Sequence, residues 1–333
     1  MGKKVAIVGI TGVVGEEMLN CLEKRNFPVD ELRVMASARS AGKKVKFKGE
    51  ELTVIEAKED SFKGIDIALF AIEADQSKLF APAAVKAGAL VIDNSSAFRM
   101  DPECPLVVPE INPEAAKKAP KGIIANPNCS TIIMNVPVFP LHKVNPVKRL
   151  VVSTYQAASG AGRPAMEELA ANAKAWAEGK PFTPKVFPYP LFMNVFSHNA
   201  SIGADGYNGE EVKMIQETRK IFSAPEIRLT ATCVRVPVLR AHCESINIEF
   251  TNPMPEKQVY DILSSAKGVR ILDDRKTNRS PQPADATGQG DILVGRIRQD
   301  ASQPDCRGID MFVSGDQILK GAALNAVQIA EIV

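Results

Sequence analysis

The sequence predicts an α/β protein in which a parallel-sheet domain is followed by a second domain of mixed α+β architecture. The chain has 333 residues, of which 45% are hydrophobic, so it is long enough for two cores. Short β-branched segments alternate with helix-like segments in the first third, an order typical of βαβ units. After Cys129 this order gives way to longer segments of alternating apolar and polar residues.

The first third predicts a sheet that is covered on both faces. We expect strands at residues 5–8, 32–36, 67–70, 90–92 and 123–125, and helices at residues 14–24 and 76–87. The strand segments are almost continuously apolar, which is typical of parallel strands with helices on both sides.

The remaining residues predict a mixed or antiparallel sheet with helices. We expect helices at 131–141 and 164–178, a Pro-rich irregular segment at 181–190, and strands at 149–154, 228–236, 243–250, 292–298 and 310–313. The tail, residues 317–332, has apolar residues at helical spacing. We therefore divide the chain into domains of residues 1–130 and 131–316, with a C-terminal helix, residues 317–333, that packs back on the first domain.

Composition argues against several classes of protein. The formal net charge of +2 at pH 7 gives no field that would favour nucleic acid or an anionic membrane as a partner. Every hydrophobic segment is interrupted before the roughly 18 residues that a membrane-spanning helix needs. The N-terminus lacks a signal-peptide pattern, and the six cysteines include no CxxC pair. We expect a cytoplasmic protein with free thiols and no metal site.

A glycine-rich segment, Gly9-Ile10-Thr11-Gly12-Val13-Val14-Gly15, joins the first expected strand to the first expected helix. Backbone N–H groups at such a helix N-terminus bind the pyrophosphate of dinucleotides. The same glycines would also suit a tight turn without a ligand, but the strand–turn–helix context favours dinucleotide binding. The first domain is therefore predicted to be a Rossmann-like, dinucleotide-binding domain.

The segment after the second expected strand indicates which dinucleotide is bound. An acidic residue there would accept the ribose hydroxyls of NAD, whereas this chain has Arg39 and Ser40. A guanidinium and hydroxyls suit a 2′-phosphate, so we expect NADP; the alternative is a solvated loop, because Arg is usually exposed. The solvated face of a nearby strand is expected to carry Lys43, Lys44, Lys46 and Lys48.

Cys129 lies between an apolar strand and a helix. Its thiol is therefore placed near the first helical turn, where N–H groups and the helix dipole stabilise a thiolate. This position makes Cys129 the candidate nucleophile. Cysteines within apolar, periodic segments are expected to be buried instead; these are Cys21, Cys233 and Cys243.

A thiolate needs a partner for proton transfer, and the chain has three histidines, His142, His198 and His242. His242 follows Arg235 by seven residues, so simple strand alternation puts the two side chains on opposite faces. A shared site requires the strand to break, and Pro237 gives a reason for a break. A structural role for His242 is the alternative. His142 is expected at a helix end, and His198 has no assigned role.

Two further segments have an ordinary structural explanation. Residues 156–162 are rich in small residues and predict a turn into the next helix. Glu210-Glu211-Val212-Lys213 has the composition of a charged first helical turn. Neither segment indicates a function by itself.

Together, these motifs resemble the bacterial-type aspartate-β-semialdehyde dehydrogenase family. The resemblance runs from Val5 to the tail and is most specific in Asn128-Cys129-Ser130-Thr131, in Tyr155-Gln156-Ala157-Ala158-Ser159-Gly160, and in Arg235 with His242. It implies an NADP-binding N-terminal domain, a second domain that serves catalysis and dimerisation, and a homodimer.

The resemblance also implies residue roles. Cys129 would form an acyl thioester, His242 would act as general acid/base, and Gln156 would hold the substrate and the intermediate. Arg235 would bind the α-carboxylate through two N–H groups, and Glu210, or its neighbour Glu211, would contact the amino group. The remaining implied roles are phosphate binding by Arg99 and Lys213, and an NADP site lined by Thr11, Gly12, Val13, Val14, Arg39, Ser40, Ser159, Gly160 and Gln317.

The implied activity is the NADP-dependent reductive dephosphorylation of 4-aspartyl phosphate to aspartate 4-semialdehyde, in lysine (through diaminopimelate), threonine and methionine biosynthesis. In reverse, the Cys129 thiolate would add to the aldehyde, hydride would leave to NADP, and inorganic phosphate would attack the thioester. Fold and periodicity leave open an N-acetyl-γ-glutamyl-phosphate reductase. A catalytically silent dinucleotide-binding relative is disfavoured because Cys129 and His242 are both present.

Overall fold

The computed structural model describes residues 2–333, except for the side chain of residue 304. Contacts divide the chain into two compact units: unit 1 consists of Met1–Asn128 and Ala322–Val333, and unit 2 of Cys129–Gly321. The helix that returns to unit 1 is α8 (Leu324–Glu331). It begins later than the sequence predicts, because residues Leu319–Ala323 form a π-helical turn before it. Of the helices in the described part of the chain, none is long and apolar enough to cross a membrane.

Unit 1 contains a parallel sheet with the strand order β5-β2-β1-β6-β7-β8. Its strands are β1 (Lys3–Val8), β2 (Val29–Ala36), β5 (Ile55–Glu56), β6 (Ile67–Phe70), β7 (Leu90–Asp93) and β8 (Ile123–Ala125). The sheet grows outward from β1 in both directions. This is the order of a doubly wound sheet, in which ligands bind at the carboxyl ends of the strands near β1.

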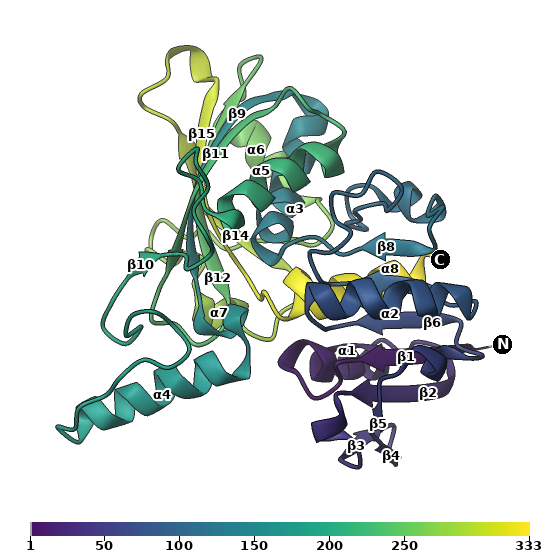
Figure 1. The fold of residues 1–333 in the computed structure, drawn as a ribbon. Helices are drawn as coiled ribbons and strands as arrows, with labels where there is room; N and C mark the ends of the chain where they lie inside the picture. Colours follow the sequence, from purple (N-terminus) through teal and green to yellow (C-terminus); the bar gives the residue numbers. More distant parts are fainter. Residues whose placement is uncertain (1) are drawn as a thin grey trace. The chain divides into compact units, whose positions relative to one another are not determined.

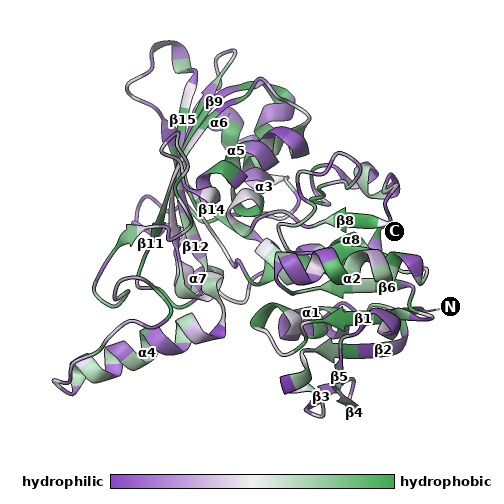
Figure 2. Ribbon diagram, viewed as in Figure 1, coloured by the Kyte–Doolittle hydropathy of each residue, from purple (hydrophilic) through white to green (hydrophobic). Residues whose placement is uncertain are grey.

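Both faces of the unit 1 sheet are covered. On one face, Ala6 and Val8 of β1 pack in a cluster with Ala81 and Ala84 of α2 (Ala74–Lys86). Val5 and its neighbours of the same parity point to the opposite face and are buried as well. Figure 2 shows β1 and β8 as hydrophobic segments. The expected continuous apolar strands are therefore explained by burial on two sides.

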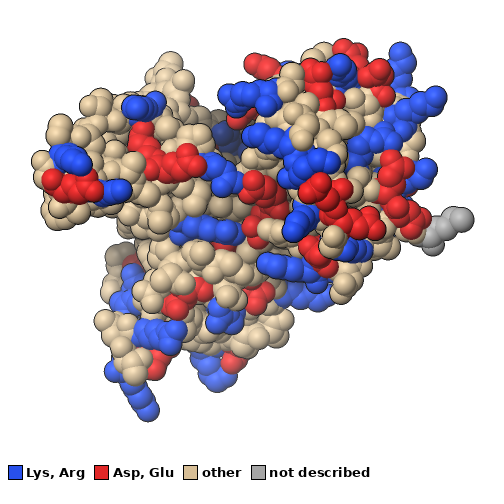
Figure 3. Space-filling model, turned by 90° about the horizontal axis from the view of Figure 1, so that it is seen from below, with Lys and Arg blue, Asp and Glu red and all other residues tan. Residues whose placement is uncertain are grey.

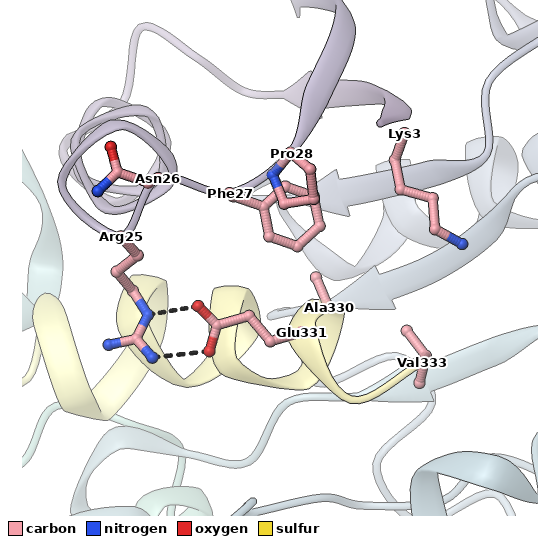
Figure 4. A pocket seen from close by; sticks show the side chains of 8 residues that line it. All are labelled: Lys3, Arg25, Asn26, Phe27, Pro28, Ala330, Glu331 and Val333. Atoms are coloured by element: carbon pink, nitrogen blue, oxygen red, sulfur yellow. Dashed lines mark hydrogen bonds and ion pairs between the residues drawn. The ribbon is translucent and has the colours of Figure 1, made fainter. Parts of the chain in front are cut away.

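The C-terminal segment is held on unit 1 by α8, which packs against α1 (Val13–Lys24). Val327 and Ile329 of α8 are fully buried. Beside them, Arg25 donates two hydrogen bonds to the carboxylate of Glu331, with Nε–Oε1 and Nη2–Oε2 distances of 2.6 and 2.7 Å (Figure 4). Because this ion pair is partly exposed, burial of the apolar residues contributes more to the attachment.

An antiparallel hairpin of β3 (Lys44–Phe47) and β4 (Glu50–Thr53) follows β2. The four lysines at positions 43, 44, 46 and 48 are exposed, as expected. On the face of the molecule shown in Figure 3, side chains of both charge signs are interspersed. This mixture is ordinary for the surface of a protein with a small net charge.

Unit 2 is built on a mixed sheet with the strand order β10-β11-β9-β12-β15-β14-β13. Its strands are β9 (Val147–Gln156), β10 (Phe196–Ser197), β11 (Arg228–Arg235), β12 (His242–Phe250), β13 (Val269–Ile271), β14 (Ile292–Gln299) and β15 (Gly308–Gly315). The pairs β9–β11 and β13–β14 are parallel, and the others are antiparallel. The expected mixed architecture is therefore present.

One face of the unit 2 sheet is covered by α3 (Cys129–Val144), α5 (Gly209–Phe222) and α6 (Glu256–Ser264), as Figure 1 shows. The other helices of unit 2 are α4 (Arg163–Ala177) and the short α7 (Pro283–Ala286). Along β9, Leu150 and Val152 are buried, whereas Val151 and Ser153 on the opposite face are only partly covered. This alternation decides which side chains at the strand ends face the interior.

Candidate active site

Three adjacent strands of unit 2 bring Arg235, Gln156 and His242 into one row. Arg235 pairs with Gln156 at the ends of β11 and β9. β12 is antiparallel to β9, with Cys243 opposite Tyr155, so His242 lies beside Gln156. All three side chains are buried on the helix-covered face.

The connection between β11 and β12, residues 236–241, is the strand break that a shared site requires. It pairs with the neighbouring loop, since Ala158 N donates to Val238 O at 2.8 Å. At its end, Ala241 has a left-handed φ of 72° and donates its N–H to Gln317 Oε1 at 2.8 Å. A left-handed alanine persists only where the surroundings fix it. The backbone that leads into His242 is thus held by the Gln317 side chain.

His242 is neutral in this environment. Burial, with a further contribution from the Arg235 cation, lowers the pKa of its imidazole to about 3. Nδ1 accepts a hydrogen bond from Ala157 N at 3.0 Å, so the single proton of the neutral ring is on Nε2. Nε2 has no hydrogen-bond partner among the described residues. Its N–H is therefore available to an oxygen atom of a bound molecule.

Gly160 leaves the space in front of this N–H open. A Cβ atom at Gly160 would lie 3.2 Å from His242 Nε2 and 3.1 Å from Arg235 Nη1. Both contacts are tight, and any larger side chain would reach between the two groups. The glycine is thus explained by the room that His242 and Arg235 need, not by a turn.

Cys129 is the first residue of α3, as its sequence context predicts. It is partly exposed, whereas Cys233 and Cys243 are buried as expected, and burial raises the pKa of the Cys243 thiol to about 11. A thiol at a helix N-terminus is better placed to ionise than either of these. A Cβ at Gly321 would approach Cys129 Cβ to 2.9 Å, so this glycine permits close packing of its segment beside the candidate nucleophile.

The first turn of α5 separates the roles of its two glutamates. Glu211 forms a capping box with Asn208: its Oε2 accepts from Asn208 N at 2.9 Å, and the Asn208 side chain accepts from Glu211 N. Its Oε1 accepts from Cys233 N at 3.0 Å. Glu210 instead points to the row of polar side chains, where it accepts from Gln156 Nε2 at 3.1 Å and from Lys213 Nζ at 3.1 Å.

Gln156 connects the two helix N-termini to the sheet. Its Nε2 donates to Ser130 Oγ at 3.0 Å and to Glu210 Oε1, and its Oε1 accepts from Thr154 Oγ1 at 3.3 Å. Ser130 follows Cys129 directly in α3. The Gln156 amide therefore fixes the start of α3 relative to Glu210.

Arg235 is a buried cation that forms no salt bridge within the described chain. Only 4% of it is exposed, and burial lowers the pKa of its guanidinium, against the attraction of Glu210 and Cys129. No carboxylate lies within ion-pair distance of it among residues 2–333. Nη1 donates to Ala157 O at 3.3 Å, and the Phe187 ring lies 5.4 Å from the guanidinium carbon. A buried guanidinium in such a setting is suited to an anionic ligand.

A second row lies two residues along each strand from the first, on the same face of the sheet, and contains Cys233, Thr154 and Glu244. Glu244 is fully buried, and neither carboxyl oxygen has a hydrogen-bond partner in the described part of the chain. Burial and the nearby charge of Glu210 raise the pKa of this carboxyl well above its usual value. Glu244 could not be singled out from the sequence, because a charged residue at one strand position predicts neither the face it lies on nor its protonation state.

We expect Glu244→Gln to stabilise the protein increasingly as the pH rises above about 5. In the wild type, the pKa of Glu244 is higher in the folded state than in the unfolded state. Between these two pKa values only the folded protein holds the proton, so its free energy of unfolding falls as the pH rises, by at most about 1.4 kcal/mol per pH unit. Thermal unfolding midpoints at fixed protein concentration and several pH values measure this difference.

Glu249→Gln, on the same strand, is the matched control. Hydrogen bonding to Lys148 lowers the pKa of Glu249, so its removal should give no benefit that grows with pH. Parallel stability curves for wild type and Glu244→Gln would contradict the prediction.

In unit 1, the glycine-rich segment forms the turn between β1 and α1. Gly9 has a φ of 91°, and a Cβ there would lie 2.2 Å from Ala71 O. A Cβ at Gly15 would lie 2.2 Å from Gly9 O. Gly12 is the N-cap of α1 and provides no side-chain cap, so the first turn, with Val13 and Val14, presents backbone N–H groups. This geometry fits a bound pyrophosphate.

The segment after β2 lies beside this turn. Thr11 Oγ1 is 3.4 Å from Ser40 Oγ, which joins the two predicted parts of the dinucleotide site. Ser40 is buried, whereas Arg39 is exposed in a short 3₁₀ helix, Ala38–Ser40, and forms no ion pair with any residue that the structure describes. Hydroxyl and guanidinium groups at this position fit a 2′-phosphate.

Arg99 is fixed between the ends of two unit 1 strands. Nη2 donates to Asn94 O at 2.7 Å, after β7, and Nε donates to Asn126 O at 3.0 Å, after β8. The loop that carries Arg99 is anchored by buried Asp93, which accepts from Ser95 Oγ at 2.7 Å. Arg99 thus has a defined position at the carboxyl edge of the sheet.

The other predicted cofactor residues lie in unit 2, next to His242. Gln317 Nε2 donates to Ser159 Oγ, while Gln317 Oε1 accepts from Ala241. Ser159, Gly160 and Gln317 are therefore grouped together, and Thr11, Gly12, Val13, Val14, Arg39 and Ser40 form a second group in unit 1. Among residues 2–333, no three His, Cys, Asp or Glu side chains are grouped as metal ligands would be.

Two family models match the chain. The "Semialdehyde dehydrogenase, NAD binding domain" model matches residues 4–119, and the "Semialdehyde dehydrogenase, dimerisation domain" model matches residues 138–320. The chain is 55% identical over 329 residues to the aspartate-semialdehyde dehydrogenase of Synechocystis sp., covering 99% of this chain and 96% of the relative. It is 52% identical over 337 residues to that of Aquifex aeolicus, covering 100% and 98%.

Solved structures give the same result. Aspartate semialdehyde dehydrogenase II from Vibrio cholerae, complexed with ASA, has a TM-score of 0.97 at 42% identity, covering 100% of this chain and 98% of that one. The aspartate semialdehyde dehydrogenase with NADP from Candida albicans has a TM-score of 0.76 at 25% identity, with the same coverage. The similarity thus extends over both units.

Proposed function

The chain belongs to the semialdehyde dehydrogenase family, and on this basis we propose that it is an NADP-dependent aspartate-semialdehyde dehydrogenase. It converts 4-aspartyl phosphate to aspartate 4-semialdehyde, reversibly. The observation that carries this function is the buried row of Arg235, Gln156 and His242, with Glu210 hydrogen-bonded to Gln156. The row offers groups for a carboxylate, an ammonium and a carbonyl oxygen of one small substrate.

In our proposal, Arg235 binds the α-carboxylate and Glu210 binds the amino group. Glu210 is available for this role because Glu211 is occupied in the helix cap. A buried carboxylate is satisfied by a charged ammonium, but an N-acetylated amine offers it no charge. This argues against the N-acetyl-γ-glutamyl-phosphate reductase alternative, and the named relatives above are aspartate-semialdehyde dehydrogenases.

Covalent catalysis is proposed for Cys129. Its thiolate attacks the acyl carbon of 4-aspartyl phosphate, a C–S bond forms, and phosphate leaves from the tetrahedral intermediate. His242 donates its Nε2–H to the carbonyl oxygen, which gains negative charge in this step. In the opposite direction, the same thiolate adds to the aldehyde carbon, Nε2–H donates a hydrogen bond to the resulting alkoxide, and the alkoxide electron pair forms the thioester carbonyl as hydride leaves. Bound NADP accepts or returns the hydride.

We place phosphate on Arg99 and Lys213. Arg99 has a fixed guanidinium in unit 1, and Lys213 projects from α5 beside Glu210. Two cations suit an anion that must enter and leave in each turnover. NADP is proposed to lie along Thr11, Gly12, Val13, Val14, Arg39 and Ser40 of unit 1 and Ser159, Gly160 and Gln317 of unit 2. Unit 1 is thus the cofactor domain, and unit 2 the substrate domain.

A homodimer in the cytoplasm completes the proposal. The second family model is a dimerisation domain. On the outer face of the unit 2 sheet, the exposed Tyr155 packs against Phe312, with ring centroids 5.9 Å apart and the rings tilted by 51°, which gives this face apolar area to bury. The six cysteines are free thiols, which suits the proposed reducing compartment.

The decisive experiment measures NADPH formation by the wild-type protein with aspartate semialdehyde, NADP and phosphate. We expect sustained turnover only when all three are present, because phosphate must release the thioester. N-acetylglutamate semialdehyde should react at least about 100-fold less efficiently, since the buried polar groups would be mismatched. Turnover without phosphate, or preference for the acylated substrate, would overturn the proposal.

The cofactor assignment predicts that Arg39→Ala weakens NADP much more than NAD. Loss of a charge-assisted hydrogen bond to the 2′-phosphate should raise KM for NADP about 10- to 100-fold. KM for NAD should stay within about twofold, because NAD lacks this phosphate. Initial-rate kinetics with each dinucleotide give both values. Lys43→Ala, which removes a nearby exposed cation, is the control; an equal effect of Arg39→Ala on both cofactors would contradict the assignment.

A further inference from the structure

The hydrogen bonds of Arg235 leave a defined pair of N–H groups for a ligand. A guanidinium has five N–H donors. Three of them are used within the described chain: Nη1 to Ala157 O, Nε to Asn199 Oδ1 at 3.4 Å, and Nη2 to His198 Nε2 at 2.7 Å. One N–H then remains on each terminal nitrogen. N–H groups on two nitrogens of one guanidinium can bind both oxygens of a carboxylate.

His198 makes the shortest of these contacts. The backbone places it there, because β10 pairs antiparallel with β11, with Phe196 opposite Arg235, and His198 N donates to Cys233 O at 2.8 Å. Since a guanidinium only donates, His198 Nε2 accepts, and the ring proton is on Nδ1. The 3.2 Å approach of Ala200 N to Nδ1 is then a close contact, because a neutral imidazole has only one acceptor nitrogen.

The acceptor on Nη2 is neutral, and this has an electrostatic consequence. Burial and the Arg235 charge lower the pKa of His198 to about 4, so the ring stays uncharged at neutral pH. A carboxylate in the same place would cancel the guanidinium charge and compete with an anionic ligand. A neutral imidazole orients the guanidinium and leaves its charge to the ligand.

We propose that His198 is a positioning residue that aligns Arg235 for the substrate α-carboxylate and thereby sets the preference for a substrate that carries one. The inference rests on the proposed function, since it assumes that aspartate semialdehyde is the substrate. It assigns a role to His198, the residue that directly follows the short edge strand β10. This histidine acts on the substrate only through Arg235.

Three variants separate positioning from general support of the fold. His198→Leu removes the acceptor, His198→Gln keeps a neutral acceptor oxygen, and Ser197→Ala changes the exposed neighbour. Each is assayed with aspartate semialdehyde and with 3-aminopropanal, which is the same aldehyde without the carboxylate. The readouts are kcat and KM for both aldehydes, and KM for phosphate and NADP.

His198→Leu should raise KM for aspartate semialdehyde about tenfold, the size expected for one hydrogen bond to a charged group, and leave kcat within about twofold. Its kcat/KM for 3-aminopropanal should equal that of wild type. His198→Gln should restore KM to within about threefold. Ser197→Ala should behave as wild type with both aldehydes.

Two results would overturn the proposal: an unchanged KM of His198→Leu for aspartate semialdehyde, or an equal loss with both aldehydes, which would indicate a structural role. If the leucine variant does not fold, His198→Ala replaces it, with the same expected tenfold rise in KM for aspartate semialdehyde alone; equal losses with both aldehydes would refute the proposal. Failure of the wild type to oxidise aspartate semialdehyde would instead refute the proposed function.

Discussion

Cys129→Ala is expected to lower kcat for the phosphate-dependent oxidation of aspartate semialdehyde by at least about 10⁴-fold. Alanine keeps the first turn of α3 but cannot form the thioester, so neither hydride transfer to NADP nor attack by phosphate has a substrate. The fold should be unaffected, because the side chain is small and only partly buried. NADPH absorbance measures the rate.

A single-turnover experiment without phosphate tests the same step directly. The wild type should release one equivalent of NADPH per site and retain an acyl group on Cys129, detectable by peptide mass spectrometry. Cys306→Ala is the matched control, since Cys306 is exposed and lies outside the row of polar residues. Comparable turnover by Cys129→Ala, or an acyl group on another residue, would exclude the covalent mechanism.

Arg235→Lys is expected to reduce kcat/KM for aspartate semialdehyde about 100-fold although the charge is kept. The ammonium is a point charge, and it cannot donate to Ala157 and His198 while also presenting two N–H groups to a carboxylate. Most of the loss should appear in KM. Initial rates over a range of semialdehyde concentrations measure it, and circular dichroism verifies the fold.

Arg228→Lys provides a control on the same strand. Arg228 is exposed at the start of β11, so this variant should retain wild-type kinetics. If Arg235→Lys behaved in the same way, Arg235 would not be the carboxylate-binding residue.

The sequence predicted the sheet of unit 1 well because its strands are buried on both faces and therefore consist of uninterrupted apolar segments. The strand 67–70, for example, has the bounds that the structure gives it. Boundaries in unit 2 were less accurate: β9 extends beyond the expected 149–154 at both ends, to Val147 and Gln156. Edge elements such as β10 and β13 were not predicted, because two or three residues carry no periodicity.

The candidate site was predictable where a residue's local context determines its environment. Cys129 follows a strand and starts a helix, and the adjacent residues predict both elements. The choice between Glu210 and Glu211 was not predictable, because it depends on which carboxylate caps α5. The positions of His198 and Glu244 were not predictable either, because they depend on the register between paired strands, which a single sequence does not reveal.

Helix α6 was missed for a related reason. Residues Glu256–Ser264 bury only a narrow apolar stripe, with Val259 and Leu263 fully covered, and the segment lies between strongly β-like runs. A short amphipathic helix of this kind is selected by the surface on which it packs. Local sequence preference was too weak to identify it.

The row formed by Arg235, Gln156 and His242 has a consequence for substrate length. Adjacent strands are held about 4.8 Å apart by backbone hydrogen bonds, so the main chain sets the separation between the strands that carry the proposed carboxylate-binding residue, Arg235, and the proposed oxygen-binding residue, His242. Side-chain repacking changes such a separation very little. To accept an aldehyde with one more methylene, the protein would therefore need a substitution that changes the length of the side chain at one end of the row. A larger cavity alone would not make this aldehyde a good substrate.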